Sequence, residues 1–312
     1  MIALDRPLSF TLPLQRGEDV RAAQQALIRA GVLAGEADGV FGPATRAAVL
    51  ALQRREGLAE DGTLGALLWE RLLRGPALRR AAPWTEALRP FLGALLVPHG
   101  PPAGAGRHRW RLAAGGVLLE GEAAPRRSPG QPRTAALCWA QHRAALEAAA
   151  QRYAVPVELL LATACTESGG RAGAVREEPG FLGDRETPHR VSPGLMQTLI
   201  STAREALGEP GLDRAALLDP RTSAMAGAAY IRGQAIRARL PTGYDPPLVA
   251  IAYNAGSLRP SRDATDPWGL VQTRRGSGAW HADSFCAFLG DALAVLGDQK
   301  PAAETPCFAG LL

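Results

Sequence analysis

Residues 155–170 read VPVELLLATACTESGG, a nearly uncharged stretch that ends in one carboxylate, Glu167, followed by a serine and two glycines. The run from Val155 to Thr166 is apolar on most faces, which is typical of a buried helix. A carboxylate that leaves such a helix beside apolar packing is in the environment that produces a general acid. Because glycines also end ordinary surface helices, Glu167 could instead be a solvated residue. The choice between these two interpretations depends on other segments of the chain.

Two segments further along combine glycine with amide side chains on short turns. Residues 194–198 read GLMQT and residues 252–257 read AYNAGS. Both supply polar groups that could converge on one carboxylate, which favours a functional role for Glu167.

In this order and spacing, the motifs ESGG (167–170), GLMQ (194–197) and AYNAG (252–256) resemble those of the soluble lytic transglycosylases, a goose-lysozyme-like group. The stretch GAAYI (227–231) is similar to the family's helix between the last two motifs. The resemblance covers about residues 137–298. It implies a lysozyme-like helical catalytic domain, placed at 136–298, and cleavage of the β-1,4 bond between N-acetylmuramic acid and N-acetylglucosamine in peptidoglycan.

The resemblance also implies a mechanism with a single carboxylate. Glu167 would protonate the glycosidic oxygen and then take the proton of the muramic acid 6-hydroxyl as that oxygen attacks C1, which gives a 1,6-anhydro product. Tyr253 is the second catalytic residue that it implies, as the group that orients Glu167. The implied substrate-binding residues are Ser168, Met196, Gln197, Tyr230 and Asn254.

Without the resemblance, the sequence also allows purely structural roles for these residues. Met196 could fill a gap in the core, Gln197 could be a surface amide, and Tyr253 could be a buried ring with one satisfied hydroxyl. The chain also departs from the usual family pattern, since Val191-Ser192-Pro193 precedes the second motif and Ile200 stands where a proline is usual.

The insert at residues 171–191 leaves a hydrolytic alternative open. A hydrolase of this kind, a muramidase, generally needs a second carboxylate. The insert offers four candidates, which as loop residues would ordinarily be solvated: Glu177, Glu178, Asp184 and Glu186.

The amino-terminal residues 14–75 form a separate pattern. Helical stripes predict helices at about Glu18–Ala30, Pro43–Arg55 and Thr63–Leu73, enough for one small three-helix bundle. Between them lie two turns, DGVFGP (38–43) and DG (61–62). Together with LQRG (14–17) and GL (57–58), this pattern resembles the small peptidoglycan-binding domain of many cell-wall hydrolases. A helical spacer without ligand, or a non-catalytic peptidoglycan-binding protein, are the alternatives.

Residues 76–135 give the weakest pattern and are interpreted as a linker or uncharacterised segment. Within it, residues 109–112 and 117–120 flank an Ala-Ala-Gly-Gly turn and predict a short β-hairpin. Trp110 could stack on a sugar or pack against a neighbouring domain, and the second is favoured. Residues 299–312 are treated as a carboxy-terminal tail. The fold class expected for the whole chain is mainly α.

Composition narrows the partners. The formal charge of +5 and pI of about 9.4 suit an anionic polymer such as peptidoglycan. Nucleic acid is not expected, because the basic residues are scattered rather than concentrated in a run with aromatics. The four cysteines and five histidines lack metal-ligand spacing, so neither a metal nor another cofactor is expected. Three of the cysteines lie in apolar helical contexts and are predicted to be buried thiols: Cys138, Cys165 and Cys286.

Residues 1–16 lack the apolar core of a signal peptide, and no transmembrane segment or membrane insertion is expected. We therefore expect synthesis in the cytoplasm and action on the cell wall after release, either during phage lysis or through a secretion system.

Overall fold

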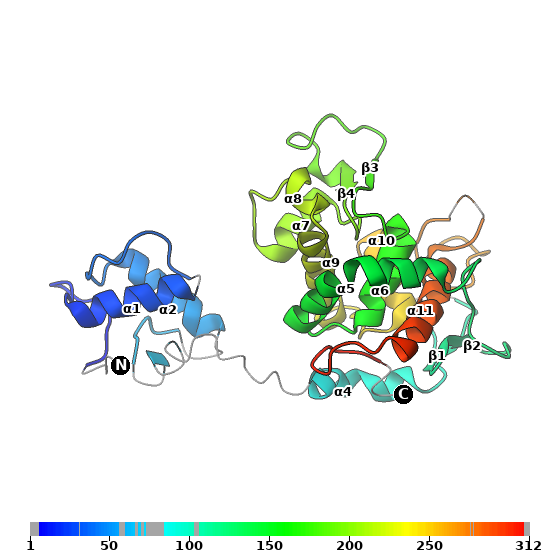
Figure 1. Cartoon of the computed structure of the whole chain (residues 1–312), viewed down its shortest axis with the longest axis horizontal. Helices are drawn as coiled ribbons and strands as arrows, with labels where there is room; N and C mark the ends of the chain where they lie inside the picture. Colours follow the sequence, from blue (N-terminus) through cyan, green and yellow to red (C-terminus); the bar gives the residue numbers. More distant parts are fainter. Residues whose placement is uncertain are drawn as a thin grey trace. The chain divides into compact units, whose positions relative to one another are not determined.

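The computed structural model describes residues 6–30, 32–55, 60–65, 68–69, 72, 84–102, 106–274, 276 and 278–308. It divides into two compact units, Met1–Ala82 and Pro83–Leu312 (Figure 1). Both units are mainly helical, as predicted.

The first unit contains α1 (Glu18–Arg29) and α2 (Pro43–Arg55), which begin and end within one residue of the predicted bounds. Their predicted stripes are buried in one small core, with Val20, Leu27 and Val49 fully inaccessible. The third predicted helix, Thr63–Leu73, begins later than predicted, because residues 63–65 are not helical and Leu64 instead forms a bridge with Leu8. Residues 66, 67, 70, 71 and 73 and the Gly57-Leu58 pair lie outside the described residues. Its described members Leu68, Trp69 and Leu72 are helical and buried.

The two Asp-Gly turns of this unit are built in the same way. The side-chain amide of the buried Gln24 donates to Asp38 (2.7 Å) and accepts from the Gly39 N–H (2.7 Å). Gln53 on α2 makes the equivalent bonds to Asp61 (2.6 Å) and Gly62 (2.9 Å). Each glutamine thus satisfies the polar groups of a turn from inside the core. The repeated arrangement explains why both turns carry the same dipeptide.

The second unit surrounds α6 with other helices. Its described elements run in the order α4 (Trp84–Leu95), β1 (Trp110–Ala113), β2 (Gly116–Leu119), α5 (Arg133–Tyr153), α6 (Val157–Ser168), β3 (Val175–Glu177), a 3-10 turn (Pro188–Arg190), β4 (Val191–Pro193), α7 (Ile200–Leu207), α8 (Arg214–Leu218), α9 (Pro220–Ile236), α10 (Pro246–Ala255) and α11 (His281–Asp298). Helices α5 and α11 pack directly on α6. All residues of α6 except Glu167 are buried, in agreement with a sequence that is apolar on most faces.

Two helix starts follow from acid-proline pairs. The Asp219 carboxylate caps α9 by accepting from the Thr222 N–H at 2.8 Å, with Pro220 as the first helical residue. Asp245 precedes the two prolines that begin α10, but its side chain faces elsewhere. These helices carry Tyr230 and Tyr253, so their starts help to place the site.

The predicted hairpin is present, and it belongs to the second unit. Strands β1 and β2 pair antiparallel, with Trp110 opposite Leu119. The Trp110 side chain is buried, and its Nε1–H donates to Asp245 at 2.9 Å. Trp110 therefore packs in the core of its own unit, and neither on a sugar nor against a neighbouring domain as the favoured interpretation had it. Helix α4, which was not predicted, adds Leu88 and Leu95 to the same core.

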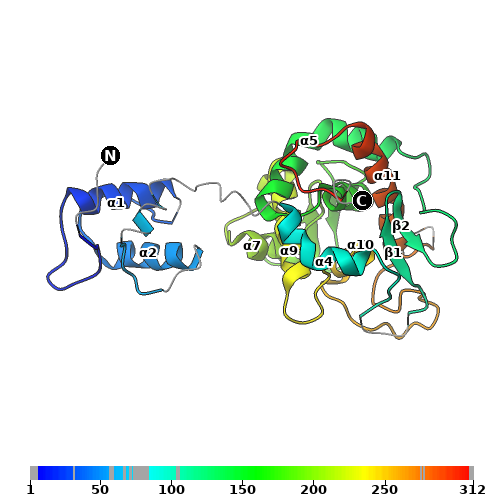
Figure 2. The ribbon, with the colours of Figure 1, turned by 90° about the horizontal axis from the view of Figure 1, so that it is seen from below.

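The end of the chain is also part of this unit as far as Phe308, which is fully buried. Figure 2 shows this segment running alongside α5, where Gln151 donates to Thr305 at 3.0 Å. The predicted tail is thus packed structure over its described part. Cys138, Cys165 and Cys286 are buried free thiols, as predicted. Within the described part of the chain, no helix has the length and apolar character needed to cross a membrane.

Candidate active site

Glu167 lies in the last turn of α6 and opens into a cleft. The helix ends at Gly169, whose φ of +64° is a left-handed conformation that glycine adopts without strain. The Glu167 side chain is only 7% exposed, yet it lines the cleft. A solvated carboxylate before a glycine helix end is therefore excluded, and the buried environment predicted from the sequence is present.

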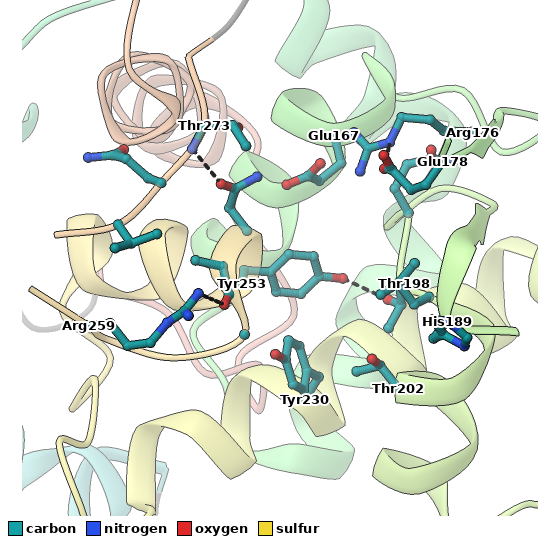
Figure 3. Close-up of a pocket in the computed structure, with 17 residues that line it drawn as sticks. Glu167, Arg176, Glu178, His189, Thr198, Thr202, Tyr230, Tyr253, Arg259 and Thr273 are labelled. Carbon is teal, nitrogen blue, oxygen red and sulfur yellow. Dashed lines mark hydrogen bonds and ion pairs between the residues drawn. The ribbon is translucent and has the colours of Figure 1, made fainter. Parts of the chain in front are cut away.

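The cleft has a volume of about 520 Å³ and is lined mainly by the second motif and the residues after it, the end of α10 and the loop before α11, with Tyr230 from α9. In Figure 3, Glu167 lies on one side of the Tyr253 ring and Tyr230 on the other. Of the seven predicted site residues, five line the cleft: Glu167, Gln197, Tyr230, Tyr253 and Asn254.

The second motif forms a tight turn against α8 and α9. Gly194 has a φ of +87°, and a Cβ there would lie 1.9 Å from the Leu217 carbonyl oxygen. Only glycine fits this contact. The turn also places Gln197 in the left-handed region, with a φ of +49°. The strain is offset by side-chain hydrogen bonds, because the Gln197 amide donates to the Ala174 and Gly194 carbonyls, both at 2.9 Å.

These bonds limit how Gln197 could bind substrate, which was its expected role. Both of its N–H donors are used within the loop, and the Ser192 hydroxyl lies 3.5 Å from its Oε1. Its side chain lines the cleft, but its amide nitrogen holds the turn together. A sugar could meet only the amide oxygen.

The structure does not bring two of the predicted substrate contacts, Met196 and Ser168, to the cleft. Met196 is fully buried and packs against Gly227 on α9, where the missing side chain makes room for it. It is core, which was the plainer interpretation of this residue. Ser168 is also buried, and its hydroxyl donates to the Leu195 carbonyl at 2.7 Å. Ser168 therefore ties α6 to the second motif and does not line the cleft.

The third motif places Tyr253 at the centre of the cleft. Its hydroxyl donates to the Met196 carbonyl at 2.9 Å and lies 2.7 Å from the Thr198 Oγ1. Burial raises the pKa of Tyr253 well above its usual range. Tyr253 was expected to orient Glu167, but its hydroxyl bonds to the second motif, so these contacts join the two motifs. The rings of Tyr230 and Tyr253 meet edge to face, 5.4 Å apart.

The group that contacts Glu167 is a residue that the sequence analysis did not single out. The Nε2 of His281, at the start of α11, lies 3.2 Å from the Glu167 Oε1, and its side chain is 5% exposed. Thr198, Thr202, Arg259, Gln272 and Thr273 also line the cleft and were not predicted. Thr198 belongs to the quoted second motif, whereas Arg259, Gln272 and Thr273 carry no local signal, because they reach the cleft only through the packing of distant segments.

The insert brings one of its four carboxylates to the cleft. Strand β3 pairs with β4, and Glu178 follows β3 and lines the cleft beside Arg176, with which it pairs at 2.9 Å. Glu177 and Asp184 instead bind Arg214 of α8, at 2.9 and 2.6 Å. Glu186 is exposed and does not line the cleft. The described residues contain no group of three or more acidic, histidine or cysteine side chains that could hold a metal ion.

This arrangement of a buried helix-end glutamate beside two glycine turns agrees with a known domain family. Residues 144–266 match the family model of the transglycosylase SLT domain. The second unit carries a transglycosylase SLT domain. Residues 16–72 match the model of a putative peptidoglycan binding domain. The SLT match contains all three motifs and ends before α11, so His281 lies outside it. No curated protein sequence matches the chain.

Proposed function

We propose that the SLT domain is a peptidoglycan lytic transglycosylase, with Glu167 as its acid and base. The observation that carries this proposal is the position of Glu167, whose side chain is 93% buried yet opens into the cleft formed by the motifs. Such a carboxyl group is shielded from bulk water and can still reach a bound sugar. Peptidoglycan as the substrate class follows from both domain matches.

The reaction balances with one carboxyl group. The Glu167 acid donates its proton to the oxygen of the β-1,4 bond, and the bond from that oxygen to C1 breaks. The 6-hydroxyl oxygen of the same muramic acid then bonds to C1, and its proton returns to Glu167. The two products are one strand with a free 4-hydroxyl and one strand that ends in a 1,6-anhydro sugar. No water is consumed.

The rest of the cleft suits a polar sugar chain. Tyr230 contributes an aromatic ring, and polar side chains of α7 and of the loop before α11 line the same cleft. A second hollow of about 520 Å³ shares Tyr230, Thr202 and Gly256 with the first and extends it along α9. The groove is therefore longer than the immediate surroundings of Glu167, as a polymer requires.

A hydrolytic reaction is the second candidate function, and Glu178 is the observation that favours it. A hydrolase needs a carboxylate that activates water, and Glu178 is the only carboxylate of the insert that lines the cleft. Arg176 pairs with Glu178 at 2.9 Å, although both side chains are about half exposed, at 55% and 41%. Of the four candidates for a second catalytic carboxylate, we therefore retain only Glu178.

The mass of the released products separates these two reactions. Purified sacculi would be digested with wild-type protein and with Glu178→Gln, and the muropeptides analysed by mass spectrometry. A transglycosylase releases products one water lighter than those of a hydrolase, and the Glu178→Gln variant should give the same products. Reducing-end muramic acid, lost in Glu178→Gln, would establish the hydrolase instead. Release of no product by the wild type would favour a non-catalytic binding protein.

A further inference from the structure

His281 lies within ion-pair distance of Glu167. Its Nε2 lies 3.2 Å from Oε1, and both side chains are more than nine-tenths buried. Among the residues that the structure describes, it is the only basic group within ion-pair distance, 4.0 Å, of Glu167. It comes from α11, beyond the residues matched by the SLT model.

The backbone around His281 is fixed from the cleft side. Its N–H donates to the Thr273 carbonyl at 3.1 Å, and the next N–H, of Ala282, donates to the Gln272 side chain at 2.9 Å. These bonds satisfy two of the free N–H groups at the start of α11. The Thr273 N–H in turn donates to the Asn254 side chain at 2.9 Å.

A continuous path of contacts therefore runs from the third motif to the acid. Asn254 on α10 holds Thr273, Thr273 holds the first residue of α11, and that residue reaches Glu167. The path explains why Asn254 lines the cleft with its side-chain oxygen already bonded to the backbone. It gives Asn254 a part in orienting the acid.

The chemistry of a neutral imidazole suits both states of Glu167. With the proton on Nε2, the ring donates to Oε1 whether the carboxyl group is charged or protonated on Oε2. Oε2 is then left to exchange its proton with the substrate. An arginine or lysine here would be a permanent cation and would favour the carboxylate throughout the reaction. Histidine can fix the geometry without imposing that charge.

We propose that His281 is the positioning residue that fixes the Glu167 carboxyl group through an Nε2–H to Oε1 hydrogen bond. This proposal rests on the proposed function, in which one oxygen of Glu167 must both deliver and recover a proton. A displacement of about 1 Å in such a group costs on the order of 100-fold in rate. The effect should fall on kcat, because His281 is not among the residues that line the cleft.

Two variants separate positioning from packing. His281→Phe keeps a planar ring of similar size but cannot donate, whereas His281→Gln retains an N–H donor near the place of Nε2. On glycan strands from amidase-treated sacculi, we expect His281→Phe to lose about 100-fold in kcat at nearly unchanged KM. His281→Gln should recover most of that loss. Equal loss in both variants, or full kcat in His281→Phe, would overturn the proposal.

A readout without activity keeps this test apart from that of the proposed function. Long-range proton–nitrogen NMR of the wild-type protein at neutral pH reports which ring nitrogen of His281 carries the proton. We expect the Nε2–H form, with a shift of this resonance in Glu167→Gln. A proton on Nδ1 alone would exclude the donor role, whatever products the enzyme releases. Wild-type protein without anhydro products would overturn the proposed function, while the NMR result would still decide the hydrogen bond.

Discussion

The polar atoms around Glu167 divide into those that reach the acid and those that hold its surroundings. His281 contacts the carboxyl group, whereas the Tyr253 hydroxyl contacts Thr198 and the Met196 carbonyl. Because burial raises the pKa of Tyr253, its hydroxyl stays protonated and acts as a donor. Tyr253 thereby joins the second and third motifs across the cleft.

Tyr253→Phe should therefore cost stability as well as activity. The change leaves the Met196 carbonyl without its donor and removes a partner of Thr198, which should lower the free energy of unfolding by about 1–3 kcal/mol. Urea unfolding measures this loss. Tyr153→Phe, on a half-buried ring at the end of α5, is the matched control and should change little. A Tyr253→Phe protein as stable as the wild type would show that these hydrogen bonds contribute nothing to the fold.

Gly194 gives a second prediction at the level of one residue. An alanine here would combine a φ of +87° with a Cβ 1.9 Å from a backbone oxygen, which cannot move as a flexible side chain can. We expect Gly194→Ala to lower the free energy of unfolding by at least about 2 kcal/mol. Gly211→Ala, with nothing within 4 Å of its Cβ, is the control. Equal effects of the two changes in thermal unfolding would contradict the turn geometry.

Among the elements, those with strong local signals were predicted from the sequence. The apolar run of α6, the acid-proline start of α9 and the Gly-Gly turn of the hairpin each determine local structure through nearest neighbours. Helix α4 was missed because Pro90 lies inside it and the segment around it is rich in proline and glycine. Only its packing on the core stabilises a helix there.

The site was predicted less completely, for a physical reason. Motifs identify residues that lie near a turn, but they do not say whether a side chain faces the cleft or the core. Ser168 and Met196 stand beside the acid and the glutamine in sequence, and both point into the core. His281 lies more than a hundred residues from Glu167, so only the packing of α11 on α6 brings them together.

The start of α10 is tied to the segment before β1 by a buried pair, and this pair should make stability depend on pH. His99 Nε2 and Trp110 Nε1 both contact the Asp245 carboxylate. Burial raises the pKa of Asp245. Burial opposes protonation of His99, but its bond to Asp245 outweighs this effect and raises its pKa above the ordinary 6.5. Because both pKa values are raised, the folded chain binds more protons than the unfolded chain over the pH range in which these groups titrate.

The contribution of His99 is therefore complete below pH 6.5 and is lost as the pH rises through its higher folded value. We expect the free energy of unfolding to fall between pH 6.5 and 9 by more in the wild type than in His99→Gln. Urea unfolding across this range measures the difference. Burial lowers the pKa of His108, so His108 makes the free energy of unfolding rise with pH. Because His108 is present in both proteins, its effect cancels in the comparison. Parallel pH profiles would show that the pair does not take up a proton on folding.

At the scale of the whole molecule, the chain combines two units with separate cores. The first unit matches a putative peptidoglycan binding domain and the second an SLT domain. A binding unit on the same chain raises the local concentration of the enzyme at an insoluble polymer. Removal of residues 1–82 should therefore weaken binding to sacculi by about 100-fold or more, as loss of avidity does.

The same truncation should leave cleavage of short soluble glycans almost unchanged, because Glu167 and the cleft lie wholly in the second unit. Sedimentation with sacculi and turnover of soluble glycans measure the two effects. Equal binding of the full chain and the truncated protein would mean that the first unit has another ligand or acts as a spacer.

The central claim is that Glu167 is the acid on which glycan cleavage depends, and the most direct test is the rate of muropeptide release from sacculi by wild-type protein and by Glu167→Gln. We predict a loss of about three orders of magnitude, with binding to sacculi and thermal unfolding preserved, because one group serves both proton transfers. Normal turnover by Glu167→Gln would contradict the account.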